Sequence, residues 1–147
     1  MTAADRISIH ILLVEDNPGD VLLTQEALKD AKIVNDLTVA SNGEEALEIL
    51  YKGIADQHPL PDLIMLDLNM PRKGGHDVLK ALNTDPDLFA IPVVILTSSM
   101  AEYNAFQENG LEVSQYIQKP VNFEKMVSIV HSVSHFSFDI VRITPQT

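Results

Sequence analysis

The sequence contains no cysteine, which excludes both a disulfide framework and a thiolate metal site. It also lacks any apolar run approaching the roughly 20 residues that cross a bilayer. The first residues, Met1–His10, lack the basic flank and long apolar core of a signal peptide. From these absences we expect a cytoplasmic protein with no membrane segment.

Basic residues are scarce. Ten Lys and Arg stand against 21 Asp and Glu, which gives a formal charge of −11. A surface of that sign repels phosphate backbones, so we expect no nucleic-acid partner. The acidity is explained by solubility or, alternatively, by a cleft that holds a cation. With 147 residues, of which 46% are hydrophobic, the chain can form one domain with one core.

Short apolar runs alternate with amphipathic stretches, and no repeat or interdomain linker is found. Strands are expected at Ser8–Val14, Leu37–Ala40, Leu63–Leu66, Pro92–Leu96 and Val113–Ile117. Helices are expected from Asn17 to about Asp30, at Gly43–Lys52, after Gly74–Gly75, at about Met100–Asn109, and after Asn122. Strands that are apolar throughout are covered on both faces, which predicts an α/β fold with a doubly wound parallel sheet. The more polar fifth strand is expected at an edge.

Several packing details follow from helical spacing. Leu23, Ala27 and Ala31 are expected on one face of the first helix, and Gly53 is expected to end the second. In the last helix, the residues expected toward the core are Phe123, Met126, Val127, Val130 and Val133. Ile129, Val133 and Phe136 would add a second apolar stripe, which favours contact with a partner.

Ligands of such sheets lie beyond the carboxyl ends of the strands. The residues expected there are Glu15, Asp16, Asp67, Thr97 and Lys119. Taken singly, each has an ordinary explanation as a turn residue, a strand residue or a surface charge. Their occurrence together at one edge of the sheet indicates a functional site.

Three neighbouring carboxylates repel one another, and a hard divalent cation relieves that repulsion. Asp16, Asp67 and a backbone carbonyl near Asn69 would supply ligands to Mg²⁺, and Glu15 would hold a metal-bound water. A carboxylate can also attack phosphorus, and Asp67 is the best candidate for that nucleophile. Lys119 and the Thr97 hydroxyl would then meet the negative oxygens of the transferring group.

Four strings match one family in order and spacing. They are LVED at Leu13–Asp16, LDLNMP at Leu66–Pro71, ILTS at Ile95–Ser98 and KP at Lys119–Pro120. The sequence resembles, from about Ile7 to Phe136, the receiver domain of bacterial two-component response regulators. This resemblance implies a flavodoxin-like fold with strand order 2-1-3-4-5, and a cis bond before Pro120.

The resemblance also implies roles. Asp67 would be the phosphoacceptor, and Glu15, Asp16, Asp67 and Asn69 the metal site. Thr97 would be the switch hydroxyl, Lys119 the phosphate partner, and Tyr116 the aromatic that turns inward when Thr97 moves. The alternative for Tyr116 is a half-exposed aromatic of an edge strand. Such a protein is no enzyme toward other substrates, because it catalyses only its own phosphorylation and dephosphorylation.

The expected organisation is a receiver domain at 1–136 and a short extension at 137–147, without an output domain. The resemblance implies a sensor histidine kinase as partner. EDNPGD after the first strand, Asn69 and the extension resemble the small regulators of cyanobacterial phytochromes. A homodimer through the fourth helix, the fifth strand, the fifth helix and the extension is expected. Alternatively, the extension folds back on its own domain.

Three other readings compete. A flavin-binding flavodoxin-like protein would need a Ser, Thr or Gly cradle where Glu15 and Asp16 stand. An aspartyl-phosphate hydrolase would need a second acid at Asn69. A degenerate receiver that only docks would not need the full set of acids, hydroxyl and lysine. The residues favour the phosphoacceptor.

Overall fold

The computed structural model describes residues 9–33, 35–70, 75–107 and 115–133, and within these residues five strands alternate with five helices. The strands are β1 (Ile9–Val14), β2 (Asn35–Ala40), β3 (Leu63–Asp67), β4 (Val93–Thr97) and β5 (Gln115–Gln118). The helices are α1 (Pro18–Asp30), α2 (Gly43–Ala55), α3 (Gly75–Thr84), α4 (Met100–Gln107) and α5 (Phe123–Val133).

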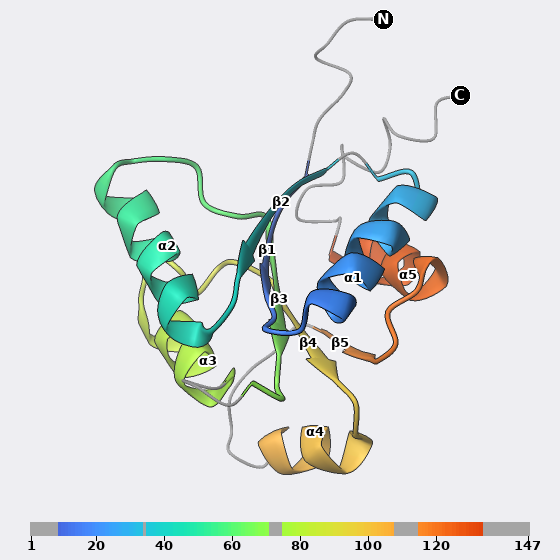
Figure 1. Cartoon of the computed structure of the whole chain (residues 1–147). Helices are drawn as coiled ribbons and strands as arrows, with labels where there is room; N and C mark the ends of the chain where they lie inside the picture. Colours follow the sequence, from blue (N-terminus) through green and yellow to red (C-terminus); the bar gives the residue numbers. More distant parts are fainter. Residues whose placement is uncertain (1–8, 34, 71–74, 108–114, 134–147) are drawn as a thin grey trace, which may run out of the picture.

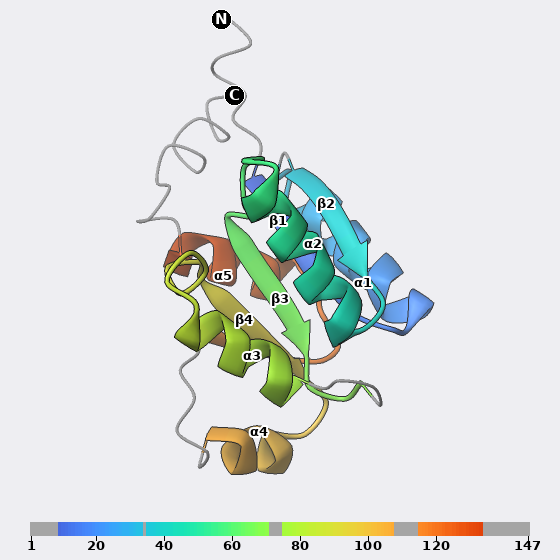
Figure 2. The same cartoon turned by 90° about the vertical axis from the view of Figure 1, so that its left-hand side faces the viewer.

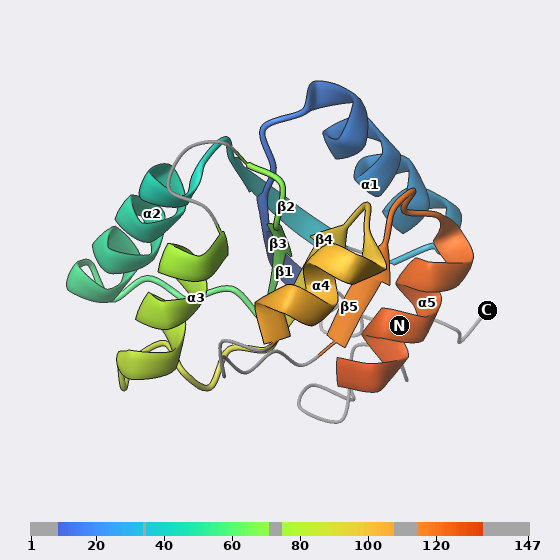
Figure 3. The same cartoon turned by 90° about the horizontal axis from the view of Figure 1, so that it is seen from below.

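The strands form one parallel sheet in the order β2-β1-β3-β4-β5, which confirms the predicted topology and the edge position of β5. Helices α1 and α5 cover one face, and α2 and α3 cover the other (Figure 1). The view turned by 90° shows α2 and α3 lying in front of the sheet (Figure 2). Seen from below, α4 lies beside β4 and β5 at the carboxyl end of the sheet (Figure 3).

The core is divided by the sheet into two clusters, because alternate strand residues point to opposite faces. On the side of α1 and α5, Leu13 and Met65 pack with residues such as Met126. On the side of α2 and α3, Leu12 and Leu66 pack with their own group. Both faces are therefore apolar, which leaves the strand ends as the place for polar side chains.

Asparagine side chains begin three helices, and each accepts a hydrogen bond from a backbone N–H of the first turn. Asn17 accepts from Asp20 at 3.1 Å, which confirms the predicted start of α1. Asn42 accepts from Glu45 N at 2.8 Å, and Asn122 accepts from Lys125 N at 2.9 Å. These bonds satisfy N–H groups that lack partners within the helix.

The prediction that Gly53 ends the second helix is wrong, because α2 continues to Ala55. The chain turns instead at Gln57, whose φ is 57°, and His58 N donates to the Gly53 carbonyl at 2.9 Å. Strand β2 also begins at Asn35, two residues earlier than predicted.

Three predictions of helix faces are wrong as well. Leu23 and Phe123 are exposed, because the buried face of α1 is Thr24, Ala27 and Leu28, and that of α5 includes Met126 and Val130. Ile129 also belongs to the core, so it is no member of an outward apolar stripe. The other predicted members of that stripe, Val133 as a side chain and Phe136, lie outside the described residues.

Predicted features at 108–114 and at 134–147, including the extension, fall outside the described residues. Among the residues that are described, no helix combines the length and apolar character that crossing a bilayer requires.

Candidate functional site

The carboxyl edge of the sheet brings three acidic residues together. Asp67 is the last residue of β3, while Glu15 and Asp16 directly follow the neighbouring strand β1. One carboxylate oxygen of each of these residues lies within 4.8 Å of the others. The sequence placed these residues after their strands, and the parallel register of β1 and β3 explains their convergence.

Burial differs among the three. Glu15 and Asp67 are buried, whereas Asp16 is exposed. The cluster therefore has two acids held inside the protein and one at its mouth. A cation or phosphate group would approach from the side of Asp16.

Lys119, which follows β5, reaches into this acidic cluster. Its Nζ lies 3.0 Å from Glu15 Oε1, 2.8 Å from Asp20 Oδ2 and 3.3 Å from Asp67 Oδ1. The Lys119–Pro120 bond is cis, as the resemblance implies. One ammonium group thus faces three carboxylates, and the site keeps an excess of negative charge.

No site role was predicted for Asp20, which makes the shortest of these contacts. The Asn17 cap fixes the first turn of α1, and this turn carries Asp20 toward Lys119. The signal was present, because an acid in the first turn of a helix after a strand lies at the carboxyl edge.

Burial and neighbouring charge shift two pKa values in this cluster. Burial is the main reason why the pKa of Glu15 rises from 4.5 to about 7, and Asp67 raises it further while Lys119 opposes the rise. Burial alone would lower the pKa of Lys119, but its hydrogen bonds to Asp20 and Glu15 and the charge of Asp67 raise it above its ordinary value. The site is therefore short of positive charge.

A divalent cation fits this donor set. Glu15 Oε1 is buried, and the Lys119 ammonium lies 3.0 Å from it. Hard cations prefer carboxylate oxygens, and the three acids offer them at one point. Asn69, exposed just beyond β3, donates its backbone N–H to Asp67 Oδ1 at 3.0 Å and so holds the start of this loop beside the acids.

Thr97 ends β4 beside Asp67, but its hydroxyl is engaged locally. It donates to the Ser99 carbonyl at 2.9 Å and accepts from Ser99 N at 3.1 Å. The Thr97 hydroxyl must therefore give up its bond to the Ser99 carbonyl before it can donate to another oxygen.

Tyr116 of β5 is 41% exposed and stacks on Tyr103 of α4, with ring centroids 4.5 Å apart. Tyr103 is buried. The sequence did not predict this contact. It places the ring of Tyr116 outside the core, against α4.

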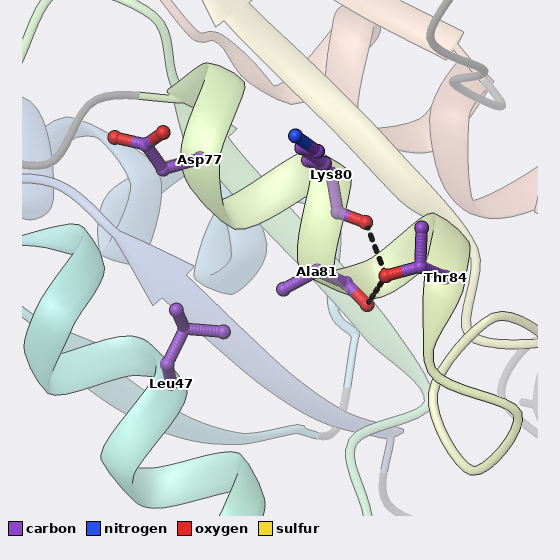
Figure 4. A pocket seen from close by; sticks show the side chains of 5 residues that line it. All are labelled: Leu47, Asp77, Lys80, Ala81 and Thr84. Carbon is purple, nitrogen blue, oxygen red and sulfur yellow. Dashed lines mark hydrogen bonds between the residues drawn. The ribbon is translucent and has the colours of Figure 1, made fainter.

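A separate hollow lies between α2 and α3 and is lined by Leu47, Asp77, Lys80, Ala81 and Thr84 (Figure 4). The Thr84 hydroxyl donates to the carbonyls of Lys80 and Ala81 in its own helix. None of the five residues is a buried polar residue. The hollow therefore offers no fixed polar group to a ligand, in contrast to the strand-end cluster.

Comparison with known proteins shows the family to which this fold belongs. Residues 11–131 match the response regulator receiver domain. Response regulator Rcp1 of Synechocystis sp. is 37% identical over 134 residues, which cover 90% of this chain and 91% of Rcp1.

Solved structures agree. The bacteriophytochrome response regulator RtBRR has a TM-score of 0.79 and 35% identity, covering 86% of this chain and 78% of that chain. The Mn²⁺-bound form of Rcp1 has a TM-score of 0.68 and 35% identity, covering 95% of this chain and 96% of that chain. With the predicted strand order present and the acids gathered at its carboxyl edge, the chain belongs to the family of response regulator receiver domains.

Proposed function

We propose that this protein is a single-domain response regulator that accepts a phosphoryl group on Asp67 from a sensor histidine kinase. The observation that carries the proposal is the Asp67 carboxylate itself. Its side chain is 2% exposed, lies beside Glu15 and Asp16, and is 3.3 Å from Lys119 Nζ. The family supports the assignment, since receiver domains are phosphorylated by histidine kinases.

In the proposed reaction, an Asp67 oxygen forms a bond to phosphorus while the bond from phosphorus to the kinase imidazole nitrogen breaks. The electron pair of the broken bond returns to the imidazole. A carboxylate is already a nucleophile at neutral pH, so the step requires no general base. The protein catalyses only this transfer and the later hydrolysis at its own Asp67.

We assign Mg²⁺ to the acidic cluster. Asp16, Asp67 and the backbone carbonyl of Asn69 would bind it, and Glu15 would hold a metal-bound water. The convergence of three carboxylates within 4.8 Å supports this assignment, as does the Mn²⁺ in the related Rcp1 structure. When bound, the ion neutralises charge on the transferring phosphoryl group.

Lys119 and Thr97 would contact the phosphoryl oxygens. Lys119 Nζ is already within 3.3 Å of Asp67 and needs only to loosen its contact with Asp20. Thr97 would exchange its bonds to Ser99 for a bond to the phosphoryl group. Charge-assisted hydrogen bonds of this kind are strong enough to replace neutral ones.

The switch would continue through Tyr116. Its ring rests on Tyr103 in the described structure. When Thr97 moves toward the phosphoryl group, we expect Tyr116 to leave Tyr103 and turn inward. This movement would change the surface formed by α4, β5 and α5, which we propose as the output surface.

Residues 1–136 would form the receiver, and the signal would pass by protein contact in the cytoplasm. RtBRR is a bacteriophytochrome response regulator by name. We therefore propose a bacterial phytochrome as the kinase, and a homodimer through α4, β5, α5 and the extension.

Phosphotransfer tests the acceptor directly. Wild-type protein with Mg²⁺ and acetyl phosphate should gain one phosphoryl group, located at Asp67 by mass spectrometry of peptides. The Asp67→Asn variant should gain none. Asp77→Asn is the matched control, because Asp77 is an exposed acid of α3 outside the cluster. Modification at another residue, or none in wild type, contradicts the proposal.

The kinase and the dimer need separate tests. A panel of histidine kinases that includes phytochromes should show fastest transfer from a phytochrome. Sedimentation with and without beryllofluoride, which mimics the acyl phosphate, tests the dimer. An unchanged monomer at high concentration in both states would remove the dimer while leaving the acceptor intact.

A further inference from the structure

Both the nitrogen and the oxygen of the Asn69 side-chain amide are hydrogen-bonded to residues that follow β4. Its Nδ2 donates to Oε1 of Glu102, and its Oδ1 accepts from Ser98 Oγ at 3.3 Å. Ser98 directly follows Thr97, and Glu102 lies in the first turn of α4. A bridge therefore joins the loop after β3 to the loop and helix after β4.

This bridge borders the proposed reacting atoms. The backbone N–H of Asn69 donates to Asp67 Oδ1 at 3.0 Å, so its side chain begins beside the acceptor carboxylate. An amide near a phosphoryl group can orient a water molecule, because it offers both donors and an acceptor. Here the amide oxygen and one N–H are already engaged by Ser98 and Glu102.

The start of α4 explains why Glu102 can reach Asn69. Ser99 Oγ accepts from Glu102 N at 3.3 Å, so Ser99 caps the first turn that carries Glu102. Ser99, two residues past Thr97, carries a hydroxyl and no carboxylate. The carboxylate near Asn69 comes instead from one turn further along the chain.

We infer that Glu102 is a positioning residue that holds the Asn69 amide away from the attacking water and so lengthens the lifetime of the acyl phosphate. The inference rests on the proposed function, since it needs a phosphoryl group on Asp67. In hydrolysis the water oxygen bonds to phosphorus, and the bond from phosphorus to the Asp67 oxygen breaks. Its electron pair stays on the carboxylate, and the protons of the water leave with inorganic phosphate.

Glu102→Ala removes the acceptor and frees the Asn69 amide. After phosphorylation with acetyl phosphate and rapid removal of the donor, loss of the phosphoryl group should be about 3- to 10-fold faster than in wild type. Glu102→Gln keeps an Oε1 acceptor and should retain a lifetime close to that of wild type. A structural role for charge at the start of α4 would instead affect both variants.

The double variant tests whether Asn69 carries the effect. In the Asn69→Ala background, which keeps the backbone carbonyl and N–H, adding Glu102→Ala should change the lifetime little. Glu44→Ala, an exposed acid in the first turn of α2, is the matched control and should leave the lifetime unchanged.

Outcomes separate this inference from the proposed function. If wild type gains no phosphoryl group on Asp67, the proposed function fails. If wild type is phosphorylated but Glu102→Ala has an equal or longer lifetime, the inference alone is overturned. It is also overturned if the two substitutions act additively.

Discussion

The two halves of the carboxyl edge are held in different ways. Glu15 and Asp67 are buried acids that follow or end the central strands β1 and β3. On the other half, β5 is an edge strand, Tyr116 is exposed, and the Thr97 hydroxyl is held by Ser99 in its own turn. The β1–β3 half is a fixed, charged half suited to receive the proposed phosphoryl group. The β4–β5 half is held by fewer contacts and can respond to that group.

The largest expected effect lies in the fixed half. Leu13→Ala, at a fully buried position of β1, should lower the free energy of unfolding by about 2–5 kcal/mol, because it leaves a cavity under α1 and α5. Urea unfolding measures this loss. Leu22→Ala, on the exposed side of α1, is the control. A loss below about 1 kcal/mol at Leu13 would show that this half is not rigidly packed.

The second-largest effect on the free energy of unfolding should come from metal binding to the fixed half. Mg²⁺ at about a hundred times its Kd should raise the free energy of unfolding by about 2.7 kcal/mol, since only the folded cluster binds it. Thermal unfolding with Mg²⁺ and with EDTA measures the difference. Asp16→Asn should shrink it. An equal stabilisation in that variant would place the cation elsewhere.

Without metal, stability should fall as pH rises from about 4.5 to about 7. The folded Glu15 holds its proton with a pKa of about 7, against 4.5 when unfolded, because burial opposes its charge. Its contribution is therefore complete below about pH 4.5 and is lost as pH rises through about 7.

The expected loss is on the order of 1–3 kcal/mol between pH 5 and 8. Urea unfolding in EDTA measures it as the difference between wild type and Glu15→Gln, which cannot titrate at this position. Parallel pH dependence in the two proteins would show that Glu15 does not cause the change.

The smallest effect should come from the responding half. A double-mutant cycle of Tyr103→Leu and Tyr116→Leu should give a coupling energy of about 0.5–1.5 kcal/mol, the usual range for an aromatic pair. A coupling above about 3 kcal/mol would mean that this half is held as firmly as the acids, and the comparison would fail.

The strand-end residues could be predicted because two simple rules place them. Apolar runs locate the strands, and parallel strands bring their carboxyl ends to one edge. These rules put Glu15, Asp16 and Asp67 at one edge of the sheet, and they meet because β1 and β3 are neighbouring strands. The cis bond before Pro120 and the strand order came from the family resemblance.

What escaped prediction depends on side-chain direction over short windows. Leu23 and Phe123 fit the apolar spacing of their helices but are exposed. A short amphipathic helix does not show from its sequence which of two adjacent residues faces the core. The contacts of Asp20 with Lys119 and of Glu102 with Asn69 join residues far apart in sequence. Only the packed helices α1 and α4 bring them to the site.

A backbone hydrogen bond couples the ends of β4 and β5. The N–H of Lys119 donates to the carbonyl of Thr97 at 2.7 Å, so one backbone hydrogen bond joins the two residues proposed to contact the phosphoryl oxygens. A displacement of the Thr97 backbone therefore acts directly on the Lys119 backbone, and the reverse also holds. The two residues should consequently move together when a phosphoryl group binds or leaves.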